Sequence, residues 1–222
     1  MTVWKSIATL VPVACAMSFA SHASAVSIVT GDNVFPLSAE VVAADPAINN
    51  FGDDASESLT QTFQVDTTFD ALSITIAYEY DSNGTVPGSI DIEVFEVADV
   101  FASSITAGTS LFSATGVVVP GDADHVQFVL DSPLTLAATS GTAGYAFEIS
   151  NGGNPGFEWR RTGGTRNNVY AFGQFYEDGV WKNSGERDGT LAISSTAIPE
   201  PHSFVLAAVL LGGLQLAGKR RG

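Results

Sequence analysis

Ser73-Ile74-Thr75-Ile76-Ala77-Tyr78-Glu79-Tyr80 is the stretch of this 222-residue chain that decides its fold. Isoleucine or tyrosine occupies every second position, and smaller or polar side chains stand between them. A period of two is typical of a strand in an antiparallel sheet that buries one face and exposes the other. The same alternation recurs at 90–94, 125–130, 145–149 and 191–193.

Turn-forming residues separate these runs. They cluster at 81–84, 87–88, 120–122, 151–154 and 177–179. Short strands at such spacing predict an all-β body, an antiparallel two-sheet β-sandwich of jelly-roll type. Residues 169–176 lead through Glu177-Asp178-Gly179 into Val180-Trp181, which predicts a hairpin. The body shows no helical periodicity, and we expect loop with short strands between residues 31 and 54.

The C-terminal end has a different character. Pro199-Glu200-Pro201 precedes an uncharged apolar run at 203–218, and Lys219, Arg220 and Arg221 follow it as a basic stop. A helix over this run would be about 24 Å long, and flanking cations compensate for its being shorter than a bilayer core of about 30 Å. This pattern predicts a transmembrane helix with a cytoplasmic C-terminus. The alternative is a buried helix of the body.

Those same residues resemble a PEP-CTERM sorting signal over residues 198–222. The resemblance implies that a membrane-embedded exosortase is the partner that cleaves near Pro199-Glu200-Pro201. It also implies transient anchoring in the inner membrane and release to the cell surface or extracellular matrix. The family is defined by its destination, so it implies no chemistry for the body.

The N-terminal end agrees with export. Lys5 is followed by an apolar stretch at 7–20, and Ala23 and Ala25 supply the small residues of a cleavage site. This predicts a signal peptide over residues 1–25, with its own short helix, cut before Val26. We interpret Cys15 as an apolar filler of this segment. The predicted organisation is therefore signal peptide 1–25, β-sandwich 26–198 and sorting tail 199–222.

The body predicted between these ends is acidic and contains no cysteine. Residues 26–198 carry five cations and 23 acidic side chains, a net charge of about −18. Such a charge disfavours nucleic acid and anionic lipid as partners. It suits an extracellular protein, a binder of divalent cations, or both. Without cysteine the body has neither disulfide nor thiolate chemistry.

Aromatic and cationic residues gather between 157 and 182. Aromatic rings stack on sugars, and arginine binds hydroxyl groups, so Trp159, Arg160, Tyr176 and Trp181 are candidate glycan contacts. Jelly-roll sandwiches of secreted proteins often bind carbohydrate, and the body loosely resembles such modules by analogy of fold alone. The alternative is that these rings complete the core or cover its ends.

A weaker pattern concerns calcium. Asp81 and Asn83 offer oxygen ligands on a predicted turn, and Asp188 offers another near the last strand. Asp and Asn also favour turns for their own hydrogen bonding. The sequence lacks a complete EF-hand loop, and calcium is the only cofactor with any support.

Enzymatic functions find little support. His125 is the only histidine of the body, and the sequence contains neither a Gly-x-Ser-x-Gly elbow nor a P-loop. A glycan hydrolase needs only two carboxylates, and the sequence singles out no pair among the 23. We therefore expect an exported, non-catalytic surface or matrix protein, associated with exopolysaccharide. A carbohydrate-binding module and a secreted hydrolase are the alternatives.

Overall fold

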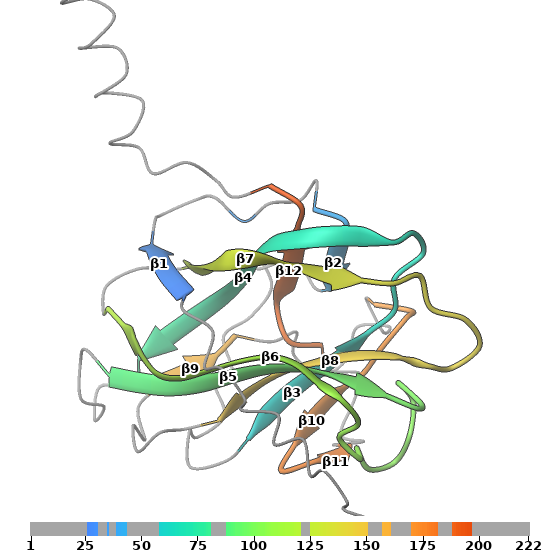
Figure 1. The fold of residues 1–222 in the computed structure, drawn as a ribbon. Helices are drawn as coiled ribbons and strands as arrows, with labels where there is room; N and C mark the ends of the chain where they lie inside the picture. The colour runs from blue at the N-terminus through green and yellow to red at the C-terminus, as the bar shows by residue number, and fades with distance from the viewer. Residues whose placement is uncertain are drawn as a thin grey trace, which may run out of the picture.

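The computed structural model describes residues 26–30, 35, 39–43, 58–80, 88–120, 125–150, 157–160, 170–181 and 188–196. These residues form two antiparallel β-sheets packed face to face, and no helix occurs among them (Figure 1). The first sheet contains β1 (Val26–Thr30), β2 (Val41–Ala43), β4 (Phe69–Tyr80), β7 (His125–Leu136), β9 (Phe157–Trp159) and β12 (Leu191–Ser194). The second contains β3 (Leu59–Phe63), β5 (Gly88–Val97), β6 (Ser110–Val119), β8 (Gly144–Ser150), β10 (Phe175–Glu177) and β11 (Val180–Trp181).

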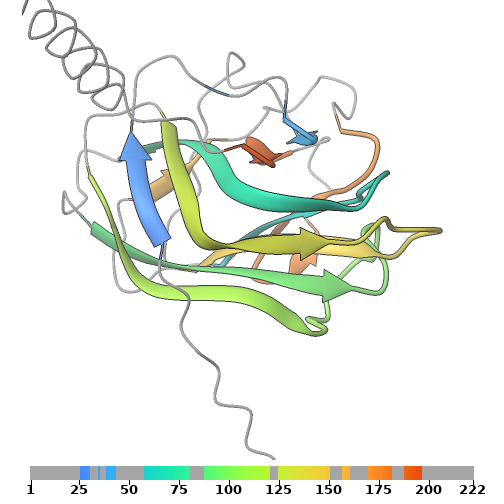
Figure 2. The ribbon, with the colours of Figure 1, turned by 45° about the horizontal axis from the view of Figure 1, so that its top comes forward.

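The strand order differs from the chain order in both sheets. It is β1-β7-β4-β12-β2 in the first sheet, with β9 paired to β4, and β11-β10-β3-β8-β5-β6 in the second. The chain crosses repeatedly from one sheet to the other, and Figure 2 shows β1, β7 and β4 lying over β5 and β6. Segments far apart in the sequence therefore become neighbours, such as β3 and β8.

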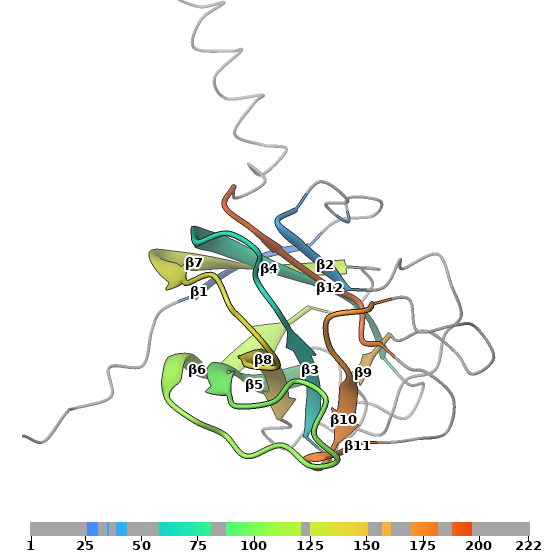
Figure 3. The same cartoon turned by 90° about the vertical axis from the view of Figure 1, so that its right-hand side faces the viewer.

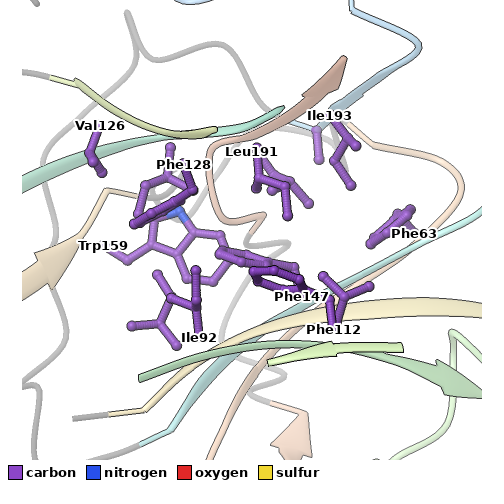
Figure 4. Close-up of a cluster of buried hydrophobic side chains, with 14 of the residues drawn as sticks. Phe63, Ile92, Phe112, Val126, Phe128, Phe147, Trp159, Leu191 and Ile193 are labelled. Carbon is purple, nitrogen blue, oxygen red and sulfur yellow. The ribbon is translucent and has the colours of Figure 1, made fainter. Parts of the chain in front are cut away.

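The core lies between the two sheets. It is built from the alternate side chains that the sequence pattern predicts, including Ile74, Ile76, Ile92 and Phe147, which are at most 2% exposed. Figure 4 shows Trp159 in this core, drawn between Phe128 and Ile92. Burial of apolar side chains on the facing sides of both sheets is the principal stabilising contribution.

Two local features follow directly from glycines. Asp178 and Gly179 both have positive φ, 51° and 71°, and join β10 to β11 in a two-residue hairpin with Tyr176 opposite Trp181. This is the turn geometry that an Asp-Gly pair favours, and it confirms the predicted hairpin. Gly173 lies against β3: a β-carbon there would stand 1.9 Å from the carbonyl oxygen of Thr62.

The all-β fold of two antiparallel sheets is confirmed, and each of the five predicted alternating segments lies in a strand. One expectation is wrong in part. The outer face of the first sheet is not exposed where it carries Ser73, Thr75 and Gln127, which are at most 4% exposed. At the end of β7 the ring of His125 lies 5.7 Å from the ring of Phe35.

Both predicted terminal segments, 1–25 and 199–222, lie outside the described residues. Among the residues that are described, no helix is long and apolar enough to cross a membrane. The predicted helix at 203–218 therefore stays a prediction.

Candidate functional site

The aromatic residues that the sequence singles out do not share one surface. Trp159, on β9 of the first sheet, is completely buried, and its indole Nε1 donates a 2.7 Å hydrogen bond to the Thr190 carbonyl. Its ring meets those of Phe147 and Phe175 edge-on, at 5.6 and 5.5 Å. With no exposed surface, this ring has no face on which a sugar can stack.

Tyr176 and Trp181 lie elsewhere, on the outer face of the second sheet. They are direct cross-strand neighbours on β10 and β11. Tyr176 is buried, and its hydroxyl lies 2.8 Å from the Ala102 carbonyl and 3.0 Å from that of Val100. Burial raises the pKa of this phenol to about 12, and the charge of Asp99 adds to the rise. Trp181 is half-buried.

The segment that covers Tyr176 is residues 98–109 between β5 and β6, which we call the strap. Its Val100 amide donates to the Thr142 carbonyl at 2.8 Å, and Ser103 accepts from the Trp181 amide at 3.1 Å. Ser104 forms a bridge with Val180, so the strap extends the sheet beyond β11. A small apolar cluster lies at its base, made of Phe95, Val97, Val100, Ala146 and Ile105.

Beside the strap, a continuous line of side chains crosses the whole outer face of the second sheet. We call it the outer row: one residue from each strand, each the register partner of the next. In sheet order its members are Ser113 (β6), Glu93 (β5), Glu148 (β8), Thr60 (β3), Tyr176 (β10) and Trp181 (β11). The strap covers the Tyr176 end, and the carboxylates occupy the middle.

Glu93 and Glu148 are the chemically notable pair in this row. They stand directly opposite each other on adjacent strands, which places their β-carbons about 5 Å apart. Both are half-buried, and Thr60 Oγ1 donates a 2.9 Å hydrogen bond to Glu148 Oε2. Burial raises the pKa of Glu148, the nearby charge of Glu93 raises it further, and the Thr60 hydrogen bond opposes both effects. A carboxyl group with a raised pKa is suited to donating or sharing a proton with a hydroxyl ligand.

Arg160 lies apart from this row, after β9. Its amide donates to the Ala77 carbonyl at 2.9 Å, and its carbonyl accepts from the Thr190 amide at 3.0 Å. It is the only lysine or arginine among the described residues, because the other cations of the expected basic corner fall at 161–169 and 182–187. The predicted grouping of Arg160 with Trp181 on one surface is therefore not seen in the described part of the chain.

The described residues that were predicted to bind calcium are not arranged as a metal site. Asp81 and Asn83 lie outside the described residues, and Asp188 is 1% exposed. The Asp188 carboxylate accepts hydrogen bonds from the Tyr170 amide at 3.1 Å and from Gln61 Nε2 at 3.4 Å, which gives it a structural role. Within the described ranges, no group of three or more His, Cys, Asp and Glu side chains is arranged to hold a metal ion.

A cavity lies at one end of the sandwich. It has a volume of about 500 Å³ and is lined mostly by small side chains and backbone. Its one carboxylate is Glu96, and its one aromatic ring is Tyr145, whose hydroxyl already donates to the Ala137 carbonyl at 3.0 Å. The outer row therefore offers more varied chemistry than this cavity.

The fold and the outer row together define a two-sheet all-β domain with a polar, partly aromatic strip across one sheet. No protein-family model matches the chain, and neither a curated protein nor a solved structure matches it. The function must therefore be argued from the residues themselves.

Proposed function

We propose that the chain is an exported, non-catalytic surface or extracellular-matrix protein, delivered by a PEP-CTERM type of sorting tail and associated with exopolysaccharide. The observation that carries this is the order of Pro199-Glu200-Pro201, the apolar run 203–218 and the basic stop Lys219 to Arg221. An exosortase-type enzyme is the partner that this tail requires. The helices at 1–25 and 203–218 belong to the same proposal.

The end of the described fold supports this arrangement. The Thr196 carbonyl accepts a 2.9 Å hydrogen bond from Ser73 Oγ, and the Ser195 amide donates to Glu40 Oε2 at 2.8 Å. The domain is thus held together up to Thr196, three residues before Pro199. Cleavage beyond that point would leave every described contact intact. At the other end, β1 begins at Val26, the residue that follows the proposed signal cleavage.

The jelly-roll class is likewise part of the proposal. Successive strands alternate between the sheets, with β3 in the second, β4 in the first, β5 and β6 in the second, β7 in the first and β8 in the second. This crossing pattern is typical of jelly rolls and supports the analogy with secreted modules.

The test is the C-terminal sequence of the protein recovered from the cell surface or medium. Mass spectrometry of the wild-type chain should show a C-terminus before residue 203. Replacing Pro199, Glu200 and Pro201 together by alanine should leave the tail in place and the chain in the membrane fraction. A surface form that retains Lys219 to Arg221 would overturn the proposal. Pro133→Ala, at an exposed position of β7, is a control for the general effect of removing proline.

A carbohydrate-binding role is the second candidate, and the outer row favours it. Trp181 supplies a half-buried aromatic ring, while Glu93, Glu148 and Thr60 supply groups that bind hydroxyls along a line across the strands. A glycan array separates this role from a purely structural one. Binding that is lost in Trp181→Ala and kept in Phe172→Ala, an exposed aromatic outside the row, would support recognition. Absence of binding across polysaccharides would favour the structural role.

The outer row also contains the two carboxylates, Glu93 and Glu148, that the remaining alternative, a secreted hydrolase, would use. Turnover of any bound glycan that disappears in Glu148→Gln, with binding retained, would establish catalysis and contradict the non-catalytic proposal. Glu96→Gln, on the exposed end of β5, is the matched control for loss of one carboxylate.

A further inference from the structure

One side of the sandwich presents two sheet edges that carry no charge. β6 (Ser-Leu-Phe-Ser-Ala-Thr-Gly-Val-Val-Val) is the terminal strand of the second sheet, and β1 (Val-Ser-Ile-Val-Thr) is the terminal strand of the first. β6 passes close to β1 and β7, and Figure 3 shows β1 and β6 on the same side of the molecule. The chain as a whole has a net charge of −15, so an uncharged edge is a place where two copies approach with less repulsion.

The other two edges differ from this side. At the far end of the second sheet, the strap pairs with β11, because Ser104 forms a bridge with Val180 and the Ile105 amide donates to the Gly179 carbonyl at 2.9 Å. At the far end of the first sheet, β2 has only three residues and follows the carboxylate of Glu40. A covered edge and a short edge beside a charge are both ways in which proteins prevent strand-to-strand association.

β6 has few of these protections. It is ten residues long, and it contains neither proline nor a charged side chain. Val118 on this strand is 56% exposed, the highest value among the exposed large apolar side chains of the described residues. Its pairing with β5 shifts register twice, near Leu111 and at Gly116; at Gly116 φ is +65° and the amide donates to Asp91 Oδ1 at 2.7 Å. Regular pairing with β5 resumes after Gly116, at Val117 to Val119.

We propose that β6 is a self-association edge, on which a second copy of this chain pairs through its own β6 in antiparallel orientation. The charge distribution selects this occupant. Two copies of an acidic chain repel each other wherever carboxylates face. Among the described strands, β6 is the long edge strand with no carboxylate of its own, and the Asp91 carboxylate of the neighbouring strand is held by the Gly116 amide. Antiparallel pairing of identical strands is related by a two-fold axis, so one uncharged segment is enough to complement itself. The outward-pointing amides and carbonyls of both edges then pair with each other.

This inference concerns the body and does not depend on the sorting route proposed above. Self-association would add to the proposed matrix function, because pairing of two β6 strands joins the outer rows of two copies in one continuous sheet. The proposed function can fail, for instance by retention of the tail, while self-association still occurs.

The test uses the full chain in detergent micelles, examined by sedimentation over a wide range of protein concentration. The wild type should show a concentration-dependent dimer. The double variant Thr115→Lys/Val118→Lys places one lysine before Gly116 and one after it in β6, so that like charges meet across the two-fold axis. It should weaken dimerisation by about tenfold or more.

The matched control is Thr142→Lys/Val180→Lys, which adds the same charges at exposed positions away from β6; Val180 is 52% exposed. This control should dimerise at least as well as the wild type. A monomeric wild type at all concentrations would overturn the proposal. So would equal dimerisation of the two double variants, since that result would assign the contact to the tail or another surface.

A cross-linking measurement keeps the proposal testable even if the lysine variant unfolds. Cys15 is the only cysteine of the sequence, so Thr115→Cys in a Cys15→Ser background carries one thiol near the middle of β6. Oxidation should yield a disulfide-linked dimer, whereas Val180→Cys in the same background should stay monomeric. Equal cross-linking of both variants, or of neither, would contradict pairing through β6.

Discussion

Replacing Trp159 tests the distinction between core and ligand surface. The side chain has no exposed surface, contacts Phe147 and Phe175 edge-on, and donates its indole N–H to the Thr190 carbonyl. Truncating a fully buried tryptophan to alanine removes about 3–5 kcal/mol of folding free energy. That is a large part of a typical total of about 5–15 kcal/mol. For a chain of this size it corresponds to a fall in Tm of about 6–20 °C.

Trp159→Phe separates the packing from the hydrogen bond. It keeps an aromatic ring in the core but leaves the Thr190 carbonyl without its indole donor, which costs about 1–3 kcal/mol. Trp181→Ala is the comparison, because this half-buried ring should cost only about 1 kcal/mol. Urea unfolding followed by far-ultraviolet circular dichroism gives all three free energies of unfolding. Equal, small losses for Trp159→Ala and Trp181→Ala would refute the assignment of Trp159 to the core.

Three other substitutions test separate features of the structure. Asp188→Ala removes the acceptor of the buried Tyr170 amide, while Gln61 Nε2 keeps its bond to the Thr62 carbonyl, so the free energy of unfolding measured in urea should fall by about 1–3 kcal/mol. A smaller loss, or a calcium-induced rise in Tm in the wild type and not in the variant, would contradict the structural role of Asp188. Gly173→Ala brings a β-carbon to 1.9 Å from the Thr62 carbonyl oxygen and should cost about 1–3 kcal/mol, and an unchanged Tm would contradict this close approach. The pKa of Glu148 is raised above its ordinary value of 4.5, so the folded state binds this proton more tightly than the unfolded state and stability falls as the pH rises above that value. Glu148→Gln should therefore raise the Tm at neutral pH and lose this advantage in acid. An equal difference in Tm at both pH values would contradict the raised pKa.

The sequence predicted strands where apolar and polar or small side chains alternate without interruption, and it failed where that alternation is broken. In β3 all five residues are buried, and the polar Gln61 lies on its inner side, where it accepts a 2.7 Å hydrogen bond from the Gly189 amide and donates to Asp188 Oδ1. A polar residue facing the core breaks the expected alternation. In β6, the bulge at Gly116 shifts the pattern by one position midway. Neither strand could be recognised from period two.

The candidate site was only partly predictable for a related reason. Glu93 and Glu148 each lie in an alternating segment, and the alternation puts both on the side away from the core. Which strands are neighbours is another matter, because 54 residues separate the two carboxylates along the chain. The predicted aromatic group shows the converse. Trp159 and Trp181 are near each other in the sequence, yet they belong to different sheets.

Local chemistry therefore determined the strand-forming segments, the Asp-Gly hairpin and the uncharged character of β6, because backbone preference and side-chain period depend on adjacent residues. The tertiary structure alone decided that Glu93 faces Glu148, that the strap buries Tyr176 and that Trp159 fills the core. Each of these depends on strand order, which is set by the packing of two whole sheets against each other and not by any single segment.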